Sequence, residues 1–132
     1  GLTWLFDVAH NTAGMRSLVD TVDRLELARP LVALVAVLGD KDWRSMLPPL
    51  FSRTDYAVLT QAPSAPSERR WSPKDAAEAV RKMTRVTIEE DFGQALEQAR
   101  REAGQGMVVV TGSVHTVGSA LQLLGREPLA GR

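Results

Sequence analysis

The uninterrupted apolar run Leu31–Leu38 constrains the fold of this chain more than any other segment. It is too short to cross a bilayer, and it shows no polar alternation, which is typical of a strand buried on both faces. Four further short apolar segments resemble it, at Thr3–Val8, Tyr56–Thr60, Arg85–Ile88 and Met107–Thr111. The run therefore predicts a central strand in a sheet whose two faces are both covered.

Longer stretches with apolar residues at helical spacing separate these segments. The second of these helices begins near Trp43, and we expect Pro48 and Pro49 to distort or end it, because proline lacks an amide hydrogen and clashes with the preceding turn. Repeated strand–helix alternation predicts an α/β layer structure with a mainly parallel sheet and helices on both faces. The first helix is predicted to bury one face, formed by Met15, Leu18, Val19, Val22 and Leu25.

Capping signals mark the remaining three helices. Ser72-Pro73 supplies an N-cap hydroxyl and a proline at the first helical position, and Met83 is predicted to end the buried stripe of that helix. The fourth helix is expected over residues 91–104 and the last over about 115–125, each ending at a glycine. Leu121 is predicted on the apolar face of the last helix.

The 132 residues suffice for one compact domain. Sixteen Lys and Arg offset sixteen Asp and Glu, so no net field attracts the chain to nucleic acid or to an anionic membrane. The absence of cysteine excludes disulfides, zinc–thiolate sites and a thiol nucleophile. Because the chain starts at Gly1 without a methionine, we expect a piece cut from a longer protein. We also expect the protein to be cytoplasmic and monomeric, with a frayed tail over Pro128–Arg132.

Three polar segments directly follow predicted strands, and we call them together the rim: Asp7–Gly14, Gly39–Asp42 and Thr111–Gly118. The carboxyl ends of parallel strands meet at one edge of a sheet, where ligands collect. Both histidines of the chain lie in the rim. An Asp can accept hydrogen bonds from hydroxyl groups, whereas Lys, Ser, His and helix N-termini hold anionic groups. The rim therefore predicts a site for a small polar ligand.

Each candidate residue also has a purely structural interpretation. Asp7 and Asn11 could cap the first helix, and Ser113 could cap the last one. His10 could be an exposed loop histidine, and Lys41 could form a solvated ion pair with a neighbouring aspartate. The predicted position of all these residues at one edge of the sheet favours a binding site.

The sequence lacks the motifs typical of several other kinds of functional site. It contains no Gly-x-x-x-x-Gly-Lys-Ser/Thr loop for a triphosphate, and the spacing of Gly112 and Gly118 differs from a dinucleotide fingerprint. Ser113 and His115 could suggest a hydrolase, but they lack the Gly-x-Ser-x-Gly pattern. The histidines and aspartates show no recognisable metal-ligand spacing, so no metal site is predicted.

The order of these motifs resembles one enzyme family. Asp7–Gly14, read as Asp-Val-Ala-His-Asn-Thr-Ala-Gly, resembles the Asp-x-Ala-His-Asn-Pro-x-Gly signature that opens the C-terminal domain of folylpolyglutamate and dihydrofolate synthases, which belong with the Mur ligases. Leu38–Asp42 resembles their strand end with a Lys-Asp pair, and Val110–Gly118 their Thr-Gly-Ser turn into a helix. Val58–Pro63 resembles the strand before their Pro- and Arg-containing loop, and Glu90–Leu96 their acidic helix start.

The resemblance implies a Rossmann-like three-layer sandwich of five or six strands, and an ATP-dependent ligase that adds glutamate to folate, or to dihydropteroate, through an acyl-phosphate. Residues 1–132 would then be its single C-terminal domain, inactive alone. The P-loop and most magnesium ligands would lie in a missing N-terminal domain. Alternatives are another Mur-type amino-acid ligase, a non-catalytic α/β binding module and a small hydrolase.

The resemblance also implies roles for individual residues. Asp7 would accept hydrogen bonds from the ribose hydroxyls of ATP, and Asn11 would help near the adenine or ribose. His10, Lys41 and Ser113 would face the phosphates and the incoming glutamate. Two positions depart from the family pattern: Thr12 stands where proline is frequent, and His115 stands where an aromatic residue such as tyrosine is common.

Overall fold

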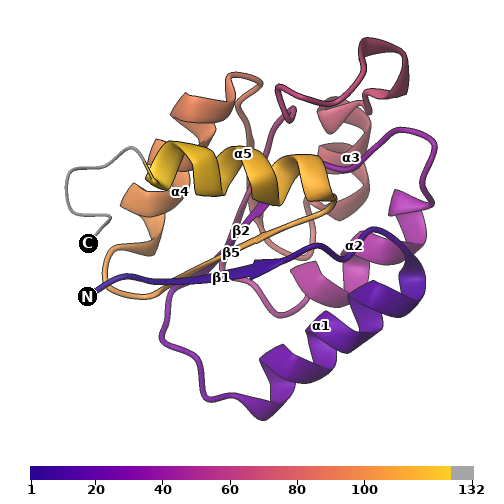
Figure 1. Cartoon of the computed structure of the whole chain (residues 1–132). Helices are drawn as coiled ribbons and strands as arrows, with labels where there is room; N and C mark the ends of the chain where they lie inside the picture. The colour runs from indigo at the N-terminus through magenta and orange to yellow at the C-terminus, as the bar shows by residue number, and fades with distance from the viewer. Residues whose placement is uncertain (126–132) are drawn as a thin grey trace.

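The computed structural model describes residues 1–125, and the predicted frayed tail lies outside this part of the chain. It shows a five-stranded sheet in which every pair of neighbouring strands is parallel. The order is β1-β5-β2-β3-β4, and Figure 1 labels β1, β5 and β2. The predicted mainly parallel α/β sheet is confirmed. The strands are β1 (Thr3–Asp7), β2 (Leu31–Val35), β3 (Tyr56–Leu59), β4 (Arg85–Ile88) and β5 (Met107–Thr111).

Helices cover both faces of the sheet and complete the three layers. The first three pack on one face with Leu31, Ala33 and Val35, and the last two pack on the other face with Val32 and Leu34. In Figure 1, α1 lies below β1 and α5 lies above it. The helices are α1 (Thr12–Arg24), α2 (Trp43–Phe51), α3 (Pro73–Val80), α4 (Phe92–Ala103) and α5 (Val114–Leu124), with a short 3₁₀ helix, η1 (Ser67–Arg69).

Strand β2 lies in the middle of the sheet and all of its residues are buried, as its apolar run predicts. The strand nevertheless ends at Val35 and not at Leu38. The next residues stay apolar because Ala36 and Leu38 pack against Ala62 and Ala65 of the loop that follows β3. This loop, residues 61–71, covers the carboxyl end of β2.

The two prolines do not end α2, which was one of the two predicted effects: the helix continues through Pro48 and Pro49 to Phe51. The carbonyl groups that lose their amide partners belong to Arg44 and Ser45, which are exposed, so water can satisfy them. Leu50 and Phe51 are fully buried and hold the last turn against the core.

Three side chains predicted in buried stripes are exposed: Leu25, Met83 and Leu121 have 50%, 43% and 50% of their surface accessible. Leu25 and Met83 lie beyond the ends of α1 and α3, where the helical spacing no longer determines the face. Leu121 lies on the outer side of α5. Within residues 1–125, no helix has both the length and the apolar character that crossing a bilayer requires.

Candidate functional site

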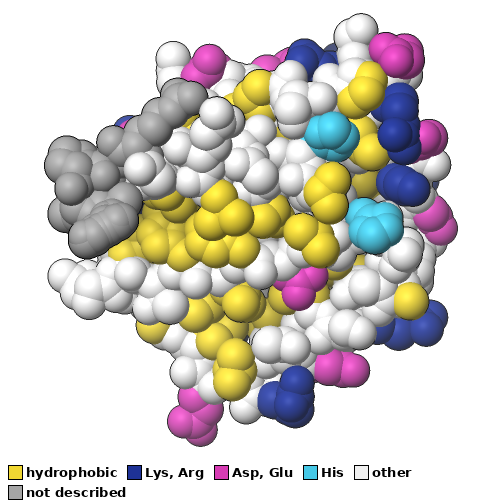
Figure 2. Space-filling model, in the orientation of Figure 1, with side chains coloured by type: hydrophobic (Ala, Val, Ile, Leu, Met, Phe, Trp, Pro, Cys, Tyr) yellow, Lys and Arg dark blue, Asp and Glu magenta, His cyan; other side chains and the backbone are white. Residues whose placement is uncertain are grey.

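The three segments of the rim meet because their strands are neighbours. Strand β5 lies between β1 and β2, and its last residue, Thr111, is in register with Asp7 on one side and Val35 on the other. Since all three strands are parallel, the segments that follow them leave the same edge of the sheet. Figure 2 shows the two histidines near one another on the visible face, beside several Lys and Arg side chains.

A pocket of ≈ 190 Å³ lies at this edge and draws on all three rim segments. It collects His10, Lys41 and Ser113, which the sequence singled out, whereas Asp7 and Asn11 do not line it. This volume suits a carboxylate or phosphate group and is small for a whole nucleotide. The remaining lining residues are Leu38, Arg69, Val114 and His115.

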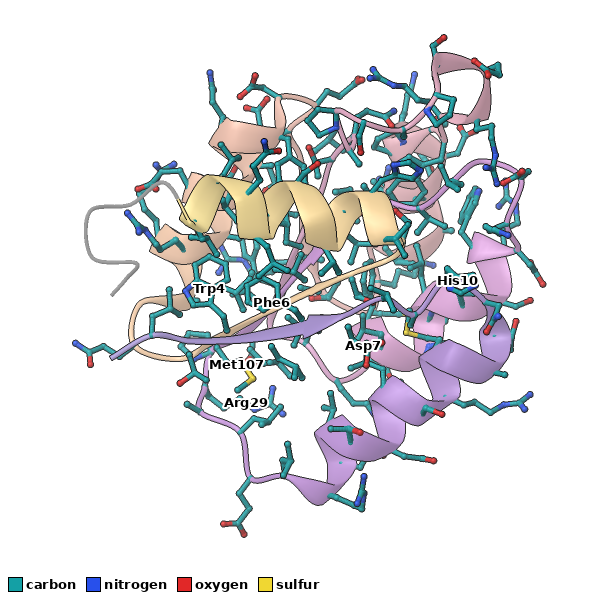
Figure 3. All side chains as sticks on the ribbon, in the orientation of Figure 1. Trp4, Phe6, Asp7, His10, Arg29 and Met107 are labelled. Atoms are coloured by element: carbon teal, nitrogen blue, oxygen red, sulfur yellow. The ribbon has the colours of Figure 1, made fainter. Side chains whose placement is uncertain are left out.

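Asp7 and Asn11 shape the loop between β1 and α1. The Asn11 side chain is the N-cap of α1 and accepts a hydrogen bond from the Gly14 amide at 2.7 Å. Asp7 is half-buried, and its Oδ1 accepts a hydrogen bond from the Ala9 amide at 2.9 Å. The capping interpretation is therefore confirmed for Asn11, while Asp7 orients the turn before the helix (Figure 3).

His10 projects from the same loop (Figure 3). Its Nδ1 lies 3.1 Å from the carbonyl oxygen of Val8, so this contact is a hydrogen bond when Nδ1 carries the proton. In the neutral ring with that tautomer, Nε2 is an acceptor, and in the charged ring both nitrogens donate. The exposed ring can thus donate to an anion when protonated.

Ser113 is the N-cap of α5, as its structural interpretation expects. Its Oγ accepts a hydrogen bond from the Thr116 amide at 3.1 Å and lies 3.0 Å from the Thr116 hydroxyl. The Thr116 hydroxyl donates in turn to the Ala36 carbonyl at the end of β2. Gly112 has a φ of 119°, and a side chain there would collide with the same carbonyl. Glycine at position 112 therefore allows the Gly112-Ser113 turn to lie directly against the end of β2.

Lys41 does not form the expected ion pair with its neighbour Asp40. The Asp40 carboxylate instead accepts hydrogen bonds from Arg69, Nε to Oδ2 at 3.0 Å and Nη2 to Oδ1 at 3.3 Å. Among the described residues, no carboxylate lies within ion-pair distance of the half-buried Lys41. Its ammonium group is thus available to a ligand in the pocket.

Arg69 is the pocket residue that the sequence reasoning did not single out. It lies in the loop 61–71, which is fixed at both ends: Gln61 Nε2 donates to the Trp71 carbonyl and Trp71 Nε1 donates to the Thr60 carbonyl, both at 2.8 Å. At mid-loop, Ser64 Oγ lies 2.8 Å from His115 Nδ1. The only sequence signal for Arg69 is the resemblance to a Pro- and Arg-containing loop, which gives no position for the side chain.

The charge of the pocket favours an anionic ligand. Lys41 lines the pocket without a carboxylate partner among the described residues, Arg69 lines it while binding Asp40, and His10 and His115 can add positive charge. In residues 1–125 no group of three or more His, Cys, Asp or Glu side chains could hold a metal ion. Fold and site together define a doubly wound α/β domain with a pocket at the carboxyl ends of its strands whose lining suits a small anion.

Comparison with known proteins places this domain in a family. The chain belongs to the Mur ligase family: the model of the Mur ligase glutamate ligase domain matches residues 1–114.

The individual relatives agree with this assignment. The chain is similar to a dihydrofolate synthase/folylpolyglutamate synthase of Mycobacterium tuberculosis, at 31% identity over 96% of this chain and 29% of the relative. The solved Mycobacterium tuberculosis folylpolyglutamate synthase complexed with ADP superposes with a TM-score of 0.77 at 33% identity, covering 92% of this chain and 30% of that one.

A second structural neighbour is the bifunctional folylpolyglutamate synthase/dihydrofolate synthase of Yersinia pestis, complexed with AMPPNP and a Mn ion. It has a TM-score of 0.74 at 30% identity and covers 92% of this chain and 28% of that one. The chain thus spans less than a third of the length of each of these relatives.

Proposed function

We propose that this chain is the C-terminal domain of a cytoplasmic, monomeric ATP-dependent ligase that adds glutamate to a folate, with dihydropteroate as the alternative acceptor. The observation that carries the proposal is the pocket in which His10, Lys41 and Ser113 meet, in a chain of the Mur ligase family. Relatives named as folylpolyglutamate or dihydrofolate synthases support the choice of substrate.

The pocket suits an amino acid with two carboxylates. Lys41 and Arg69 reach the pocket from separate loops, and Arg69 has N–H groups beyond the two that bind Asp40, so the two side chains can contact two carboxylates. His10 follows Asp7 in the loop between β1 and α1 and also lines the pocket, so it can serve both the phosphate and the glutamate side. Ser113 fixes the start of α5, where the amide groups and the positive helix end favour an anion.

The nucleotide binds across the open part of the rim, beside the pocket. Asp7 offers a carboxylate to the ribose hydroxyls, and Asn11 offers its exposed amide group nearby. ATP, when bound, supplies the phosphoryl group that activates the acceptor carboxylate as an acyl-phosphate. The P-loop and most magnesium ligands belong to an N-terminal domain of the longer enzyme, and closure of the two domains excludes water from this hydrolysable intermediate.

Two substitutions in the full-length enzyme test whether Asp7 binds the nucleotide and Lys41 binds the glutamate. Asp7→Ala is expected to raise the KM for ATP about tenfold, with a smaller effect on the KM for glutamate, because a charge-assisted hydrogen bond is lost. Lys41→Ala is expected to raise the KM for glutamate about tenfold, with a smaller effect on the KM for ATP. The exposed residues Asp20 and Lys82, changed to alanine, are matched controls that remove the same charges away from the rim.

Steady-state kinetics with each substrate varied in turn distinguishes the outcomes. Equal effects of Asp7→Ala and Lys41→Ala on both KM values would contradict the assignment of Asp7 to the nucleotide and Lys41 to the glutamate. A full-length protein that transfers another amino acid would indicate a different Mur-type ligase. One that consumes no ATP in the presence of folate and glutamate would be a non-catalytic binding module, and the proposed function would be wrong.

A further inference from the structure

The Thr111 hydroxyl is a buried polar group that nothing in the site described above uses. Thr111 has no accessible surface, and its Oγ1 has no hydrogen-bond partner. Among the residues that the structure describes, Thr60 Oγ1 is the one other buried side-chain polar atom in this state. Burying an unpaired hydroxyl costs free energy, and valine has nearly the same shape without that cost. A threonine at position 111 therefore calls for an explanation.

The strand register places this hydroxyl beside Asp7. Thr111 and Asp7 are partners in the parallel ladder between β5 and β1. Side chains alternate along both strands: Leu5, Met107 and Val109 pack on the α1 side of the sheet, and Phe6 and Val110 on the α5 side. Figure 3 shows Trp4 and Phe6 above β1 and Asp7 below it. Asp7 and Thr111 thus extend from neighbouring strands on the same face.

The Asp7 carboxylate has room for another donor. Its Oδ1 accepts the Ala9 amide, and within residues 1–125 no hydrogen bond reaches its Oδ2. A carboxylate can accept about four hydrogen bonds, so a second donor from the sheet leaves acceptor sites for a ligand. Thr111 is fully buried, so its hydroxyl cannot contact a ligand at the rim itself. Any effect that its hydroxyl has on binding is therefore exerted through Asp7.

We propose that Thr111 is a positioning residue: when the nucleotide binds, its hydroxyl donates a hydrogen bond to the Asp7 carboxylate and fixes the orientation in which Asp7 accepts the ribose hydroxyls. The unpaired hydroxyl costs stability in the free protein and contributes to nucleotide affinity in the complex, a trade-off frequently seen at binding sites. This inference rests on the proposed role of Asp7 in nucleotide binding.

Thr60 provides a matched control for the test. It is also a fully buried threonine at the carboxyl end of a strand, with an unpaired Oγ1, but it follows β3 and has no ladder contact with β1. Thr60→Val and Thr111→Val therefore remove the same group from similar surroundings. Both variants should unfold at a temperature equal to or above that of the wild type, because each replaces an unpaired buried hydroxyl with a methyl group.

The test uses the full-length enzyme. The two constants compared are the KM for ATP, from steady-state kinetics, and the Kd for ADP, from calorimetry. Thr111→Val is expected to raise both constants about fivefold without lowering the unfolding temperature, since one hydrogen bond to a charged group is lost. The KM for glutamate should stay unchanged. Thr111→Ser should restore most of the affinity because it restores the hydroxyl, and Thr60→Val should leave both nucleotide constants unchanged.

A double variant shows whether the effect passes through Asp7. In the Asp7→Ala background, Thr111→Val is expected to have no further effect on ADP affinity. The proposal is overturned if Thr111→Val behaves like Thr60→Val, if its effect persists in the Asp7→Ala background, or if the wild type binds no ADP. A wild type that binds ADP but transfers no glutamate would contradict the proposed function alone, and the ADP affinities would still decide the role of Thr111.

Discussion

The guanidinium group of Arg69 donates two hydrogen bonds to the Asp40 carboxylate, and this contact joins the loop after β3 to the turn after β2. The backbone reinforces it, because the Gly39 amide donates to the Arg69 carbonyl and Leu38 forms an isolated bridge with Arg70. Arg69 is held in this way at the edge of the pocket that also contains Lys41. The contact thus gives the loop 61–71, with its short 3₁₀ helix η1, a defined part in the site.

Arg69→Ala in the full-length enzyme is expected to raise the KM for glutamate about tenfold and to change the KM for ATP less, because the pocket loses one of its two full positive charges. The unfolding temperature should change little, since the Arg69 and Asp40 side chains are 40% and 54% exposed and such ion pairs contribute little stability. Steady-state kinetics and a thermal melt measure both effects. Arg70→Ala is the control, because Arg70 is exposed and does not line the pocket. Equal kinetic effects of the two variants would remove Arg69 from the site.

Much of this fold could be predicted from sequence because its signals are local. A strand buried on both faces needs continuous apolar residues, and Leu31–Val35 carries them. Helix starts need a short polar side chain, and Asn11, Ser72, Asp91 and Ser113 all accept the amide hydrogen bond that their residue types predict.

The missed features depend on contacts between distant parts of the chain. The predicted strand continued to Leu38 because residues 36–38 are apolar, yet Ala36 and Leu38 are buried against a loop that begins more than 20 residues later. Arg69 was not predicted as a site residue for the same reason, since it lies 29 residues from Asp40 along the chain. No periodicity within the loop 61–71 encodes where an arginine side chain points. The pocket therefore combines residues that local motifs reveal with one that only tertiary contacts place.

Gly112 and Gly118 are expected to respond in opposite ways to the same substitution. Gly112→Ala should destabilise the chain by about 3 kcal/mol or more, because residue 112 has a φ of 119° and its new methyl group would collide with the Ala36 carbonyl. Gly118→Ala should stabilise it by about 0.5–1 kcal/mol, because the site lies within α5, is exposed and has open space around it. Urea unfolding of both variants measures the difference. Similar changes of one sign would contradict the close approach of Gly112 to β2.

Asp55 is expected to make stability depend on pH in the acid range. Its carboxylate accepts hydrogen bonds from the Leu31 amide at 2.7 Å and from Arg29 Nη1 at 3.0 Å. Partial burial raises the pKa of Asp55, but the Leu31 hydrogen bond and the hydrogen bond and charge of Arg29 together outweigh it, so the pKa lies below its ordinary value of 3.8. A carboxyl group with a lowered pKa in the folded state contributes stability that is complete above its unfolded pKa. This contribution is lost as the pH falls through the folded pKa.

Asp55→Asn removes the charge and keeps a side chain of similar size, so it isolates this contribution. The wild type should exceed the variant in free energy of unfolding at pH 7. The difference should begin to shrink as the pH falls below about 4, where the carboxyl group of the unfolded chain becomes protonated, and it should be lost as the pH passes through the lowered pKa of the folded chain. Urea unfolding at pH 7, 5, 4 and 3 gives the difference directly. Because Asp55 also connects the start of β2 to the turn before β3, part of the loss at neutral pH reflects the weaker acceptor that an amide offers to Leu31. That part does not titrate, so a difference that stays constant between pH 7 and pH 3 would show that the hydrogen-bond geometry, and not the charge of Asp55, supports the amino end of β2.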